Sequence, residues 1–160
     1  PELVARVGLF DAAGVRFRDN RFGEEVLAGK NPFAVTDAAS LHAYLDVLFH
    51  DKAKAPAIPW PASAGLIRKR RADAAFEQSV LDSIGRGPER FLPGEEAANI
   101  HQPALLLWCR QDAVIDASAL GLYAARMPQA RKVLLDGCGH MSITEQPHNV
   151  ANAVEALIEH

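Results

Sequence analysis

An acid and a histidine follow two neighbouring apolar runs, each close to the point where its run ends. Asp112 lies four residues beyond the run 104–108, and His140 follows the run 132–135 in the glycine-containing stretch 137–140. If both runs are parallel strands, the two residues lie at the carboxyl edge of one sheet, where catalytic groups collect. A carboxylate there can accept the Nδ1–H of the imidazole, while Nε2 takes a proton from a nucleophile. The spacing therefore makes Asp112 and His140 candidates for an acid and a base that act together on a nucleophile.

Two simpler interpretations remain open on spacing alone. Asp116 is a competing acid, but it directly precedes a predicted helix and is better explained as the residue that caps it. His140 could equally be a loop histidine that hydrogen bonds merely hold in place. On spacing alone this second interpretation is the stronger one.

Other polar residues carry weaker signals. His42, Asp46 and His50 follow one another at helical spacing and could hold a metal, but they border an apolar stripe where solvent-facing residues belong. The remaining histidines have no partners that suggest a role: His101, His148 and His160. We therefore expect no metal and no cofactor.

The two cysteines have no metal-type spacing. Cys109 and Cys138 each follow a predicted strand, so they could lie near each other. Two free thiols are the simpler prediction, and a disulfide is possible.

Composition excludes several classes of function. The 160 residues carry 17 basic and 20 acidic side chains, a net charge of −3 that gives no general case for nucleic-acid binding. The basic run 68–71 is interpreted as a solvated helix face. No apolar stretch approaches the roughly 20 residues that span a bilayer.

The elements that must position the acid and the histidine follow an alternating pattern. Strands are predicted over 4–10, 104–108 and 132–135, and helices over about 117–127 and from Pro147, the latter with Val150, Val154, Leu157 and Ile158 as its apolar face. Strand and helix in alternation predict a parallel sheet covered by helices, an α/β fold.

The middle of the chain has a different, helical character. Thr36 is predicted to cap a helix that contains Leu41 and Leu48, and a proline-rich stretch, 56–61, follows it. A second helix is predicted over 64–84, with Phe76, Val80 and Ile84 on one face, and with termination at Gly85, Gly87 and Pro88.

Several segments together resemble the end of the α/β-hydrolase superfamily, in particular bacterial lipases and esterases similar to monoacylglycerol lipases. They read PALLLWCRQD (103–112), MPQA (127–130), GCGHM (137–141), EQP (145–147) and VGLFDAAG (7–14). The resemblance covers the whole chain, only loosely in its middle third, and Cys109 stands where the family usually has glycine. It implies a strand of the core sheet in 1–14, a helical cap in 15–99, and in 100–160 the C-terminal part of the core with Asp112 and His140 in catalytic roles.

The resemblance also implies a serine nucleophile on a tight turn between glycines. None of the six serines has a glycine two residues away on both sides: Ser40, Ser63, Ser79, Ser83, Ser118 and Ser142. Since the nucleophile precedes the acid and the histidine in this fold, we expect it upstream of Pro1, on an N-terminal part of the same hydrolase that would be this chain's partner. The chain alone is then expected to be inactive.

The expected substrate is a small carboxylic ester or lipid, with Val114 and Met141 beside its pocket. Two alternatives remain open: another α/β-hydrolase chemistry (a dehalogenase, an epoxide hydrolase or a carbon–carbon hydrolase), and a truncated, non-catalytic hydrolase that serves as an interaction domain.

Overall fold

The computed structural model describes residues 3–159, so Pro1, Glu2 and His160 lie outside the described residues. Three parallel strands form a sheet in the order β1-β2-β3. The strands are β1 (Val7–Phe10), β2 (Ala104–Cys109) and β3 (Arg131–Leu135). The helices are α1 (Arg21–Leu27), α2 (Ala38–Leu48), α3 (Ala62–Arg86), α4 (Leu92–Glu96), α5 (Ser118–Arg126), α6 (Ser142–Glu145) and α7 (Pro147–Glu159), with 3-10 turns at Lys52–Lys54 and Ala97–Asn99. The predicted α/β class is confirmed.

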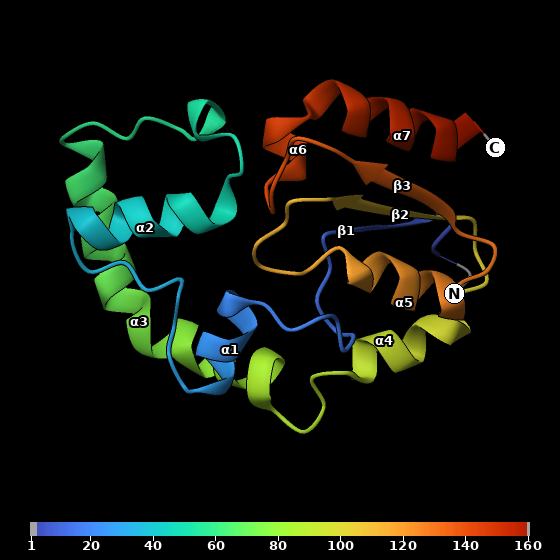
Figure 1. Cartoon of the computed structure of the whole chain (residues 1–160), viewed down its shortest axis with the longest axis horizontal. Coiled ribbons are helices and arrows are strands. Elements are labelled where there is room, and N and C mark those ends of the chain that lie inside the picture. Colours follow the sequence, from blue (N-terminus) through green and yellow to red (C-terminus); the bar gives the residue numbers. More distant parts are fainter. Residues whose placement is uncertain (1–2, 160) are drawn as a thin grey trace.

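The central strand β2 carries the core because every one of its residues is buried. Side chains alternate across a strand, so Leu105 and Leu107 pack with α7 on one face of the sheet. Leu106 and Trp108 pack with α5 on the other face. Figure 1 shows the two helices on opposite sides of the strands. A continuous apolar run is therefore needed in β2, as in other doubly covered strands.

The carboxyl ends of the strands point toward the helical middle segment (Figure 1). The paired register runs from Val7 opposite Ala104 to Phe10 opposite Leu107, and from Leu105 opposite Arg131 to Cys109 opposite Leu135. The loops that follow the three strands consequently leave the sheet at one edge. This is the edge on which the sequence places its acid and its histidine.

The predicted element limits are correct for β2, β3 and α7 to within a residue, whereas the first strand starts at Val7 rather than at residue 4. Asp37, not Thr36, caps α2: its side chain accepts the Ser40 N–H at 2.8 Å while Ser40 Oγ accepts the Asp37 N–H at 2.9 Å. This reciprocal pair satisfies two helix-end groups at once, which Thr36 cannot do from one residue earlier.

The apolar face predicted for the long helix α3 is exposed rather than packed on the core. Phe76 is 71% exposed, and Val80 and Ile84 are also exposed, whereas Leu81 is buried. The reason is the approach of α3 to α1: a Cβ on Gly85 would lie 2.6 Å from Val26 Cγ1, so the helix packs through its glycine side. Gly85 thus lies inside α3, which ends one residue later at Arg86. In α7, Ile158 is likewise exposed instead of buried.

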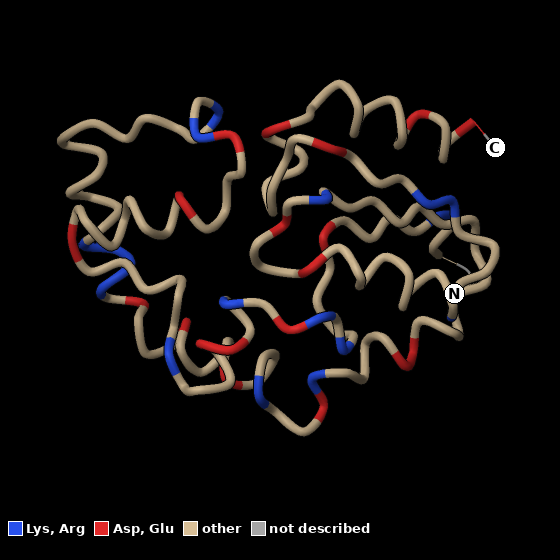
Figure 2. Tube along the Cα trace, viewed as in Figure 1, with Lys and Arg blue, Asp and Glu red and all other residues tan. Residues whose placement is uncertain are grey.

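Charged residues of both signs are spread along the chain (Figure 2). In the basic run, Arg68, Lys69 and Arg71 are exposed as expected of a solvated face. Arg70 differs, because its guanidinium lies over the Tyr44 ring at 4.9 Å, which connects α3 to α2, and it also pairs with Glu77 of its own helix at 3.1 Å. Within residues 3–159, no helix has the length and apolar character that crossing a membrane requires.

Candidate active site

Asp112 lies in the turn after β2, and backbone N–H groups of the same turn hold its side chain in place. Its Oδ1 accepts the N–H of Val114 at 2.8 Å and that of Ile115 at 3.0 Å. The indole N–H of Trp108 donates to the Ile115 carbonyl at 3.2 Å, which anchors the far end of the turn to the strand. The carboxylate is fully buried, and one oxygen is left to face a neighbour.

That neighbour is His140, whose Nδ1 lies 3.0 Å from Asp112 Oδ2. Because a carboxylate only accepts hydrogen bonds, Nδ1 carries the proton and Nε2 remains the basic nitrogen of the neutral ring. The His140 side chain is 24% exposed, whereas that of Asp112 is not exposed at all. The structure therefore brings the two predicted residues together in the arrangement that a general base requires.

Burial lowers the pKa of the His140 imidazole, but the hydrogen bond and charge of Asp112, together with the charge of Asp11, outweigh it. The net effect is a pKa above the usual value of 6.5. The site thus favours the imidazolium, the form that His140 would take after it accepts a proton.

Asp11 is a third titratable group of this site that sequence reasoning missed. It follows β1 directly, has a positive φ of 46°, and accepts the Cys109 N–H at 3.0 Å. Burial raises its pKa to about 6; the hydrogen bonds from Ser142 and Cys109 oppose this, and the charge of Asp112 adds to it. The signal that could have found it is an acid directly after a parallel strand, the same signal that identified Asp112.

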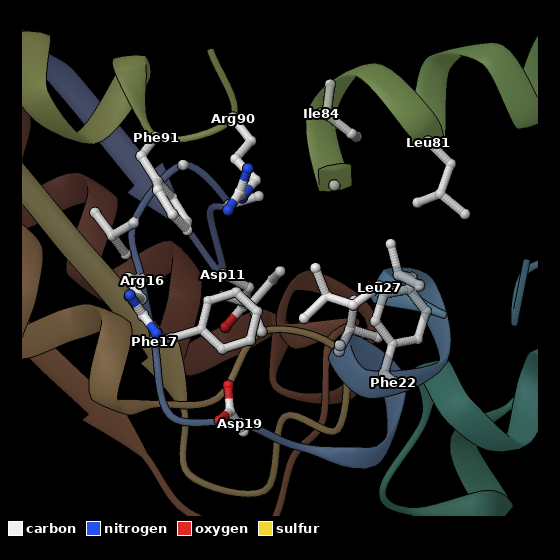
Figure 3. A pocket seen from close by; sticks show the side chains of 18 of the residues that line it. Asp11, Arg16, Phe17, Asp19, Phe22, Leu27, Leu81, Ile84, Arg90 and Phe91 are labelled. Carbon is white, nitrogen blue, oxygen red and sulfur yellow. The ribbon is translucent and has the colours of Figure 1, made fainter. Parts of the chain in front are cut away.

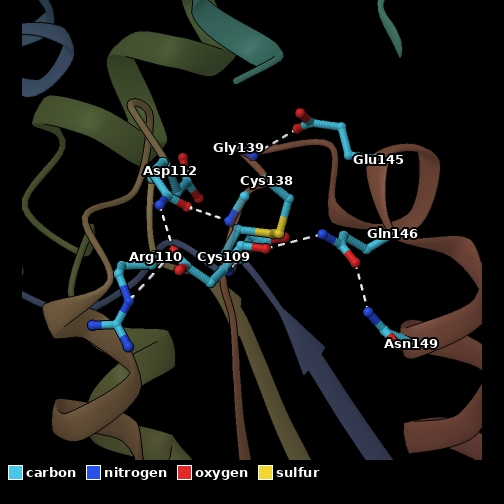
Figure 4. The surroundings of a disulfide bond; sticks show 12 residues. Cys109, Arg110, Asp112, Cys138, Gly139, Glu145, Gln146 and Asn149 are labelled. Carbon is cyan, nitrogen blue, oxygen red and sulfur yellow. Dashed lines mark hydrogen bonds and ion pairs between the residues drawn. A yellow bond between two sulfur atoms is a disulfide. The ribbon is translucent and has the colours of Figure 1, made fainter. Parts of the chain in front are cut away.

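A disulfide joins the two loops that carry the acid and the histidine. Cys109 and Cys138 are bonded, with their Cα atoms 5.3 Å apart, so the prediction of two free thiols is wrong (Figure 4). The pairing follows from the register, because β2 and β3 end side by side at Cys109 and Leu135, three residues before Cys138. Both cysteines are fully buried.

Glu145, which the sequence analysis noted only as part of the segment EQP, is a second residue whose place in the site was not predicted. It is 1% exposed, and its Oε1 accepts the N–H of Gly139, the residue before His140, at 2.6 Å. A buried carboxylate beside the histidine loop is the kind of feature that reveals itself only once the chain is folded, since Glu145 stands at the end of the short helix α6 with no distinctive spacing.

An apolar cavity of about 350 Å³ opens beside His140, within the size range of small-molecule sites. Its walls come from the loop after β1, from α1 and α3, and from the turn that holds Asp112. Figure 3 shows Phe22, Leu27, Leu81 and Ile84 around one part of it and Asp11 deeper inside. Val114 lines the cavity, as Ile115 does; Met141 does not, and packs against the main core instead.

The other sequence candidates lie in different settings. Asp116 Oδ1 accepts the Ser118 N–H at 2.9 Å just before α5, but the N-cap of this helix is Ala117, which has no side-chain cap, so the prediction that Asp116 is the capping residue is wrong by one position. On α2, His42 Nε2 lies 3.7 Å from Asp46, and His50 is beyond the end of the helix. Among residues 3–159, no group of three or more potential metal ligands gathers.

Comparisons with known proteins agree with this architecture. No protein-family model matches the chain. Monoacylglycerol lipase ABHD6 of Bos taurus is 24% identical over 159 residues, which cover 94% of this chain and 46% of that protein. Lipase 3 of Moraxella sp. (strain TA144) is 24% identical over 129 residues, 79% of this chain and 39% of its own length.

Among solved structures, a membrane phospholipase A described as a bacterial virulence factor superposes with a TM-score of 0.85 at 28% identity, covering 99% of this chain and 50% of its own. The chain thus spans about half the length of the relatives it matches. These similarities, together with the parallel sheet, show that the chain has the fold of the C-terminal part of an α/β-hydrolase and that its homologues include monoacylglycerol lipases and bacterial lipases.

Proposed function

We propose that the protein containing this chain is a serine hydrolase that cleaves carboxylic esters, with a lipase-like preference for apolar acyl groups. The observation that carries this proposal is the 3.0 Å contact between His140 Nδ1 and Asp112 Oδ2 at the wall of an apolar cavity. The names of the relatives, which are lipases and a phospholipase, favour ester cleavage over the other chemistries of the fold.

In this proposal His140 is the base and Asp112 its positioning acid. Nε2 of His140 takes the proton of a serine hydroxyl as the oxygen attacks the ester carbonyl, and then gives that proton to the departing alkoxide. Asp112 keeps the ring in the correct tautomer and stabilises the imidazolium in between. Water repeats the cycle on the acyl-enzyme, so the products are an acid and an alcohol.

The serine is proposed to come from an N-terminal part of the same hydrolase. Within residues 3–159, strand β1 is paired only with β2, so its other edge can accept a further strand. Leu9 and Phe10 are only partly buried at this edge. A neighbouring strand on this side would cover them and could place a nucleophile near His140.

Residues 15–99 are proposed to form the cap of the hydrolase, between the core strand in 1–14 and the core segment 100–160. The lining of the cavity supports this division into cap and core, because α1 and α3 supply most of the apolar wall while the core segment supplies His140 and Val114. The acyl chain of a substrate would then lie between Phe22, Leu27 and Ile84, with Val114 near the ester. Met141, which packs in the core, is not part of this pocket.

An activity-based probe tests the proposal directly. The full protein, as its gene encodes it, is treated with a fluorophosphonate, which labels activated serines, and the labelled peptide is identified by mass spectrometry. We expect labelling of one serine, loss of labelling in His140→Ala, and undiminished labelling in His148→Ala, a change at an exposed histidine of α7. Labelling that survives His140→Ala would refute the serine mechanism.

The same experiment separates the alternatives. An aspartate in place of the serine would give no labelling and would point to a dehalogenase or an epoxide hydrolase. A labelled serine that cleaves no ester in a panel of acyl lengths would point to carbon–carbon hydrolysis. A full protein without a serine, cysteine or aspartate nucleophile would identify a non-catalytic relative.

A further inference from the structure

The carboxylate of Glu145 joins two segments that are far apart in the sequence. Its Oε1 accepts the Gly139 N–H at 2.6 Å, and its Oε2 accepts the Asp51 N–H at 2.8 Å. The backbone carbonyl of the same residue accepts Nζ of Lys54 at 2.6 Å. Figure 4 shows the side chain of Glu145 directed at the backbone of Gly139. One residue thus connects the histidine loop of the core to the segment 48–54 of the proposed cap.

The two segments also touch directly. A Cβ added to Gly139 would lie 2.7 Å from the His50 backbone nitrogen and 3.0 Å from the Leu48 carbonyl oxygen. Since real Cβ atoms do not approach backbone that closely, only glycine allows this contact without a shift. The backbone of the histidine loop is therefore packed against the end of α2 with no spare room.

Burial makes the two amide donors necessary to Glu145. A carboxylate that is 1% exposed has lost its hydration and needs hydrogen-bond donors in place of water. The two oxygens each have one backbone N–H, from opposite sides of the contact. If the segment 48–54 moved away, Oε2 would lose its donor, and the side chain that holds Gly139 would be free to move.

We propose that Glu145 is a positioning residue that couples the segment 48–54 to the loop of His140, so that the contact between His140 and Asp112 depends on the docking of this segment. The inference rests on the role proposed above for His140. The inference gives the proposed cap a function beyond covering the pocket, because the segment 48–54, when docked on the core, keeps His140 aligned. Reaction at His140 would then be slowed whenever the segment is displaced, even with an intact acid and histidine.

The test uses the full protein and four substitutions. Glu145→Gln removes one acceptor oxygen, and Asp51→Pro removes the N–H that Oε2 accepts. Proline suits this position because Asp51 has a φ of −83°. Asp51→Ala is the matched control: it loses the same carboxylate, which accepts the Ala53 N–H and lies 3.8 Å from Lys54, but keeps the amide. Glu155→Gln, at an exposed residue of α7, controls for the charge.

Two readouts are measured: the low-field proton NMR signal of the His140 Nδ1–H, and kcat and KM for an ester substrate. We expect Glu145→Gln and Asp51→Pro to weaken or abolish the NMR signal and to lower kcat by about 10²-fold with little change in KM, as a small misplacement of a catalytic group does. Asp51→Ala and Glu155→Gln should change neither.

An Asp51→Pro protein that is folded by circular dichroism and matches Asp51→Ala in both readouts would overturn the coupling. This variant keeps the inference testable even if Glu145→Gln fails to fold. If the unsubstituted protein shows no ester hydrolysis, the proposed function fails, and the NMR signal alone decides whether segment 48–54 controls the contact of His140 with Asp112.

Discussion

The disulfide between Cys109 and Cys138 gives a stability prediction whose size can be worked out. The bond closes a loop across a sequence separation of 29 residues. In the chain-entropy treatment, a loop of this length removes about 12 cal/mol/K from the unfolded state, or about 3.6 kcal/mol at 25 °C. Loss of the bond should lower the free energy of unfolding by this amount, because both sulfurs are buried and the double alanine variant leaves no polar group behind.

Urea unfolding of the full protein measures the effect. With a slope of about 2 kcal/mol/M, the midpoint should fall by about 2 M on reduction. The variant in which both cysteines are alanine should have a midpoint as low as that of the reduced protein, or lower by the cost of the cavity that the substitutions leave. The reductant should not change the midpoint of this variant. Midpoints of the oxidised protein and the alanine variant within about 0.5 M of each other would refute the reasoning. The reasoning would also be refuted if the reductant lowered the midpoint of the alanine variant as much as that of the unsubstituted protein, since the reductant would then act at a site other than this disulfide.

Three further outcomes are expected. Asp11→Asn should stabilise the protein at pH 7 by up to about 3 kcal/mol. Because the pKa of Asp11 is raised to about 6 in the folded protein, its favourable contribution to the free energy of unfolding is complete below pH 3.8 and is lost as the pH rises through 6. Unfolding measured at pH 4 and pH 7 checks this, and an equal effect of the substitution at both pH values would contradict it. Asp112→Asn should lower kcat of the full enzyme by about 10⁴-fold and, since Asp112 raises the pKa of His140, should move the acidic limb of the pH–rate profile to lower pH. An acidic limb at the same pH in this variant would show that His140 is not the titrating group. Leu106→Ala, in the buried centre of β2, should cost about 2–5 kcal/mol in urea unfolding, whereas Leu134→Ala, at a 40% exposed site, should cost well under 2; equal costs would contradict the assignment of the core.

The part of the site that could be predicted is the part that follows from strand ends. Asp112 and His140 each stand just after an apolar run, and parallel strands place such positions at one edge whatever the rest of the chain does. The α/β class follows separately, from the alternation of strand and helix patterns. Asp11 directly follows the first apolar run, so the strand-end rule holds for this residue as well, although it was not among the predicted site residues.

The remainder depends on contacts that sequence spacing does not encode. Glu145 meets Asp51 across 94 residues, and no pattern in either segment announces this bond. The disulfide required the register of β2 against β3 before its geometry could be judged. The spacing of Phe76, Val80 and Ile84 predicted one apolar face of α3, but this face is exposed, because the small residue Gly85 lets the helix approach α1 closely through its other side.

The pairing of β1 with β2 has a consequence for how the chain reaches its fold. Val7 and Ala104, which are neighbours in the sheet, are 97 residues apart in the sequence, so the pairing of these two strands closes a loop that contains the whole intervening segment. Closing such a span carries an entropy cost of about 4 kcal/mol, yet doubling its length would add only about 0.6 kcal/mol. Insertions and deletions between these two strands therefore cost little free energy, so the segment proposed as the cap can change in length and shape while the strand order stays unchanged.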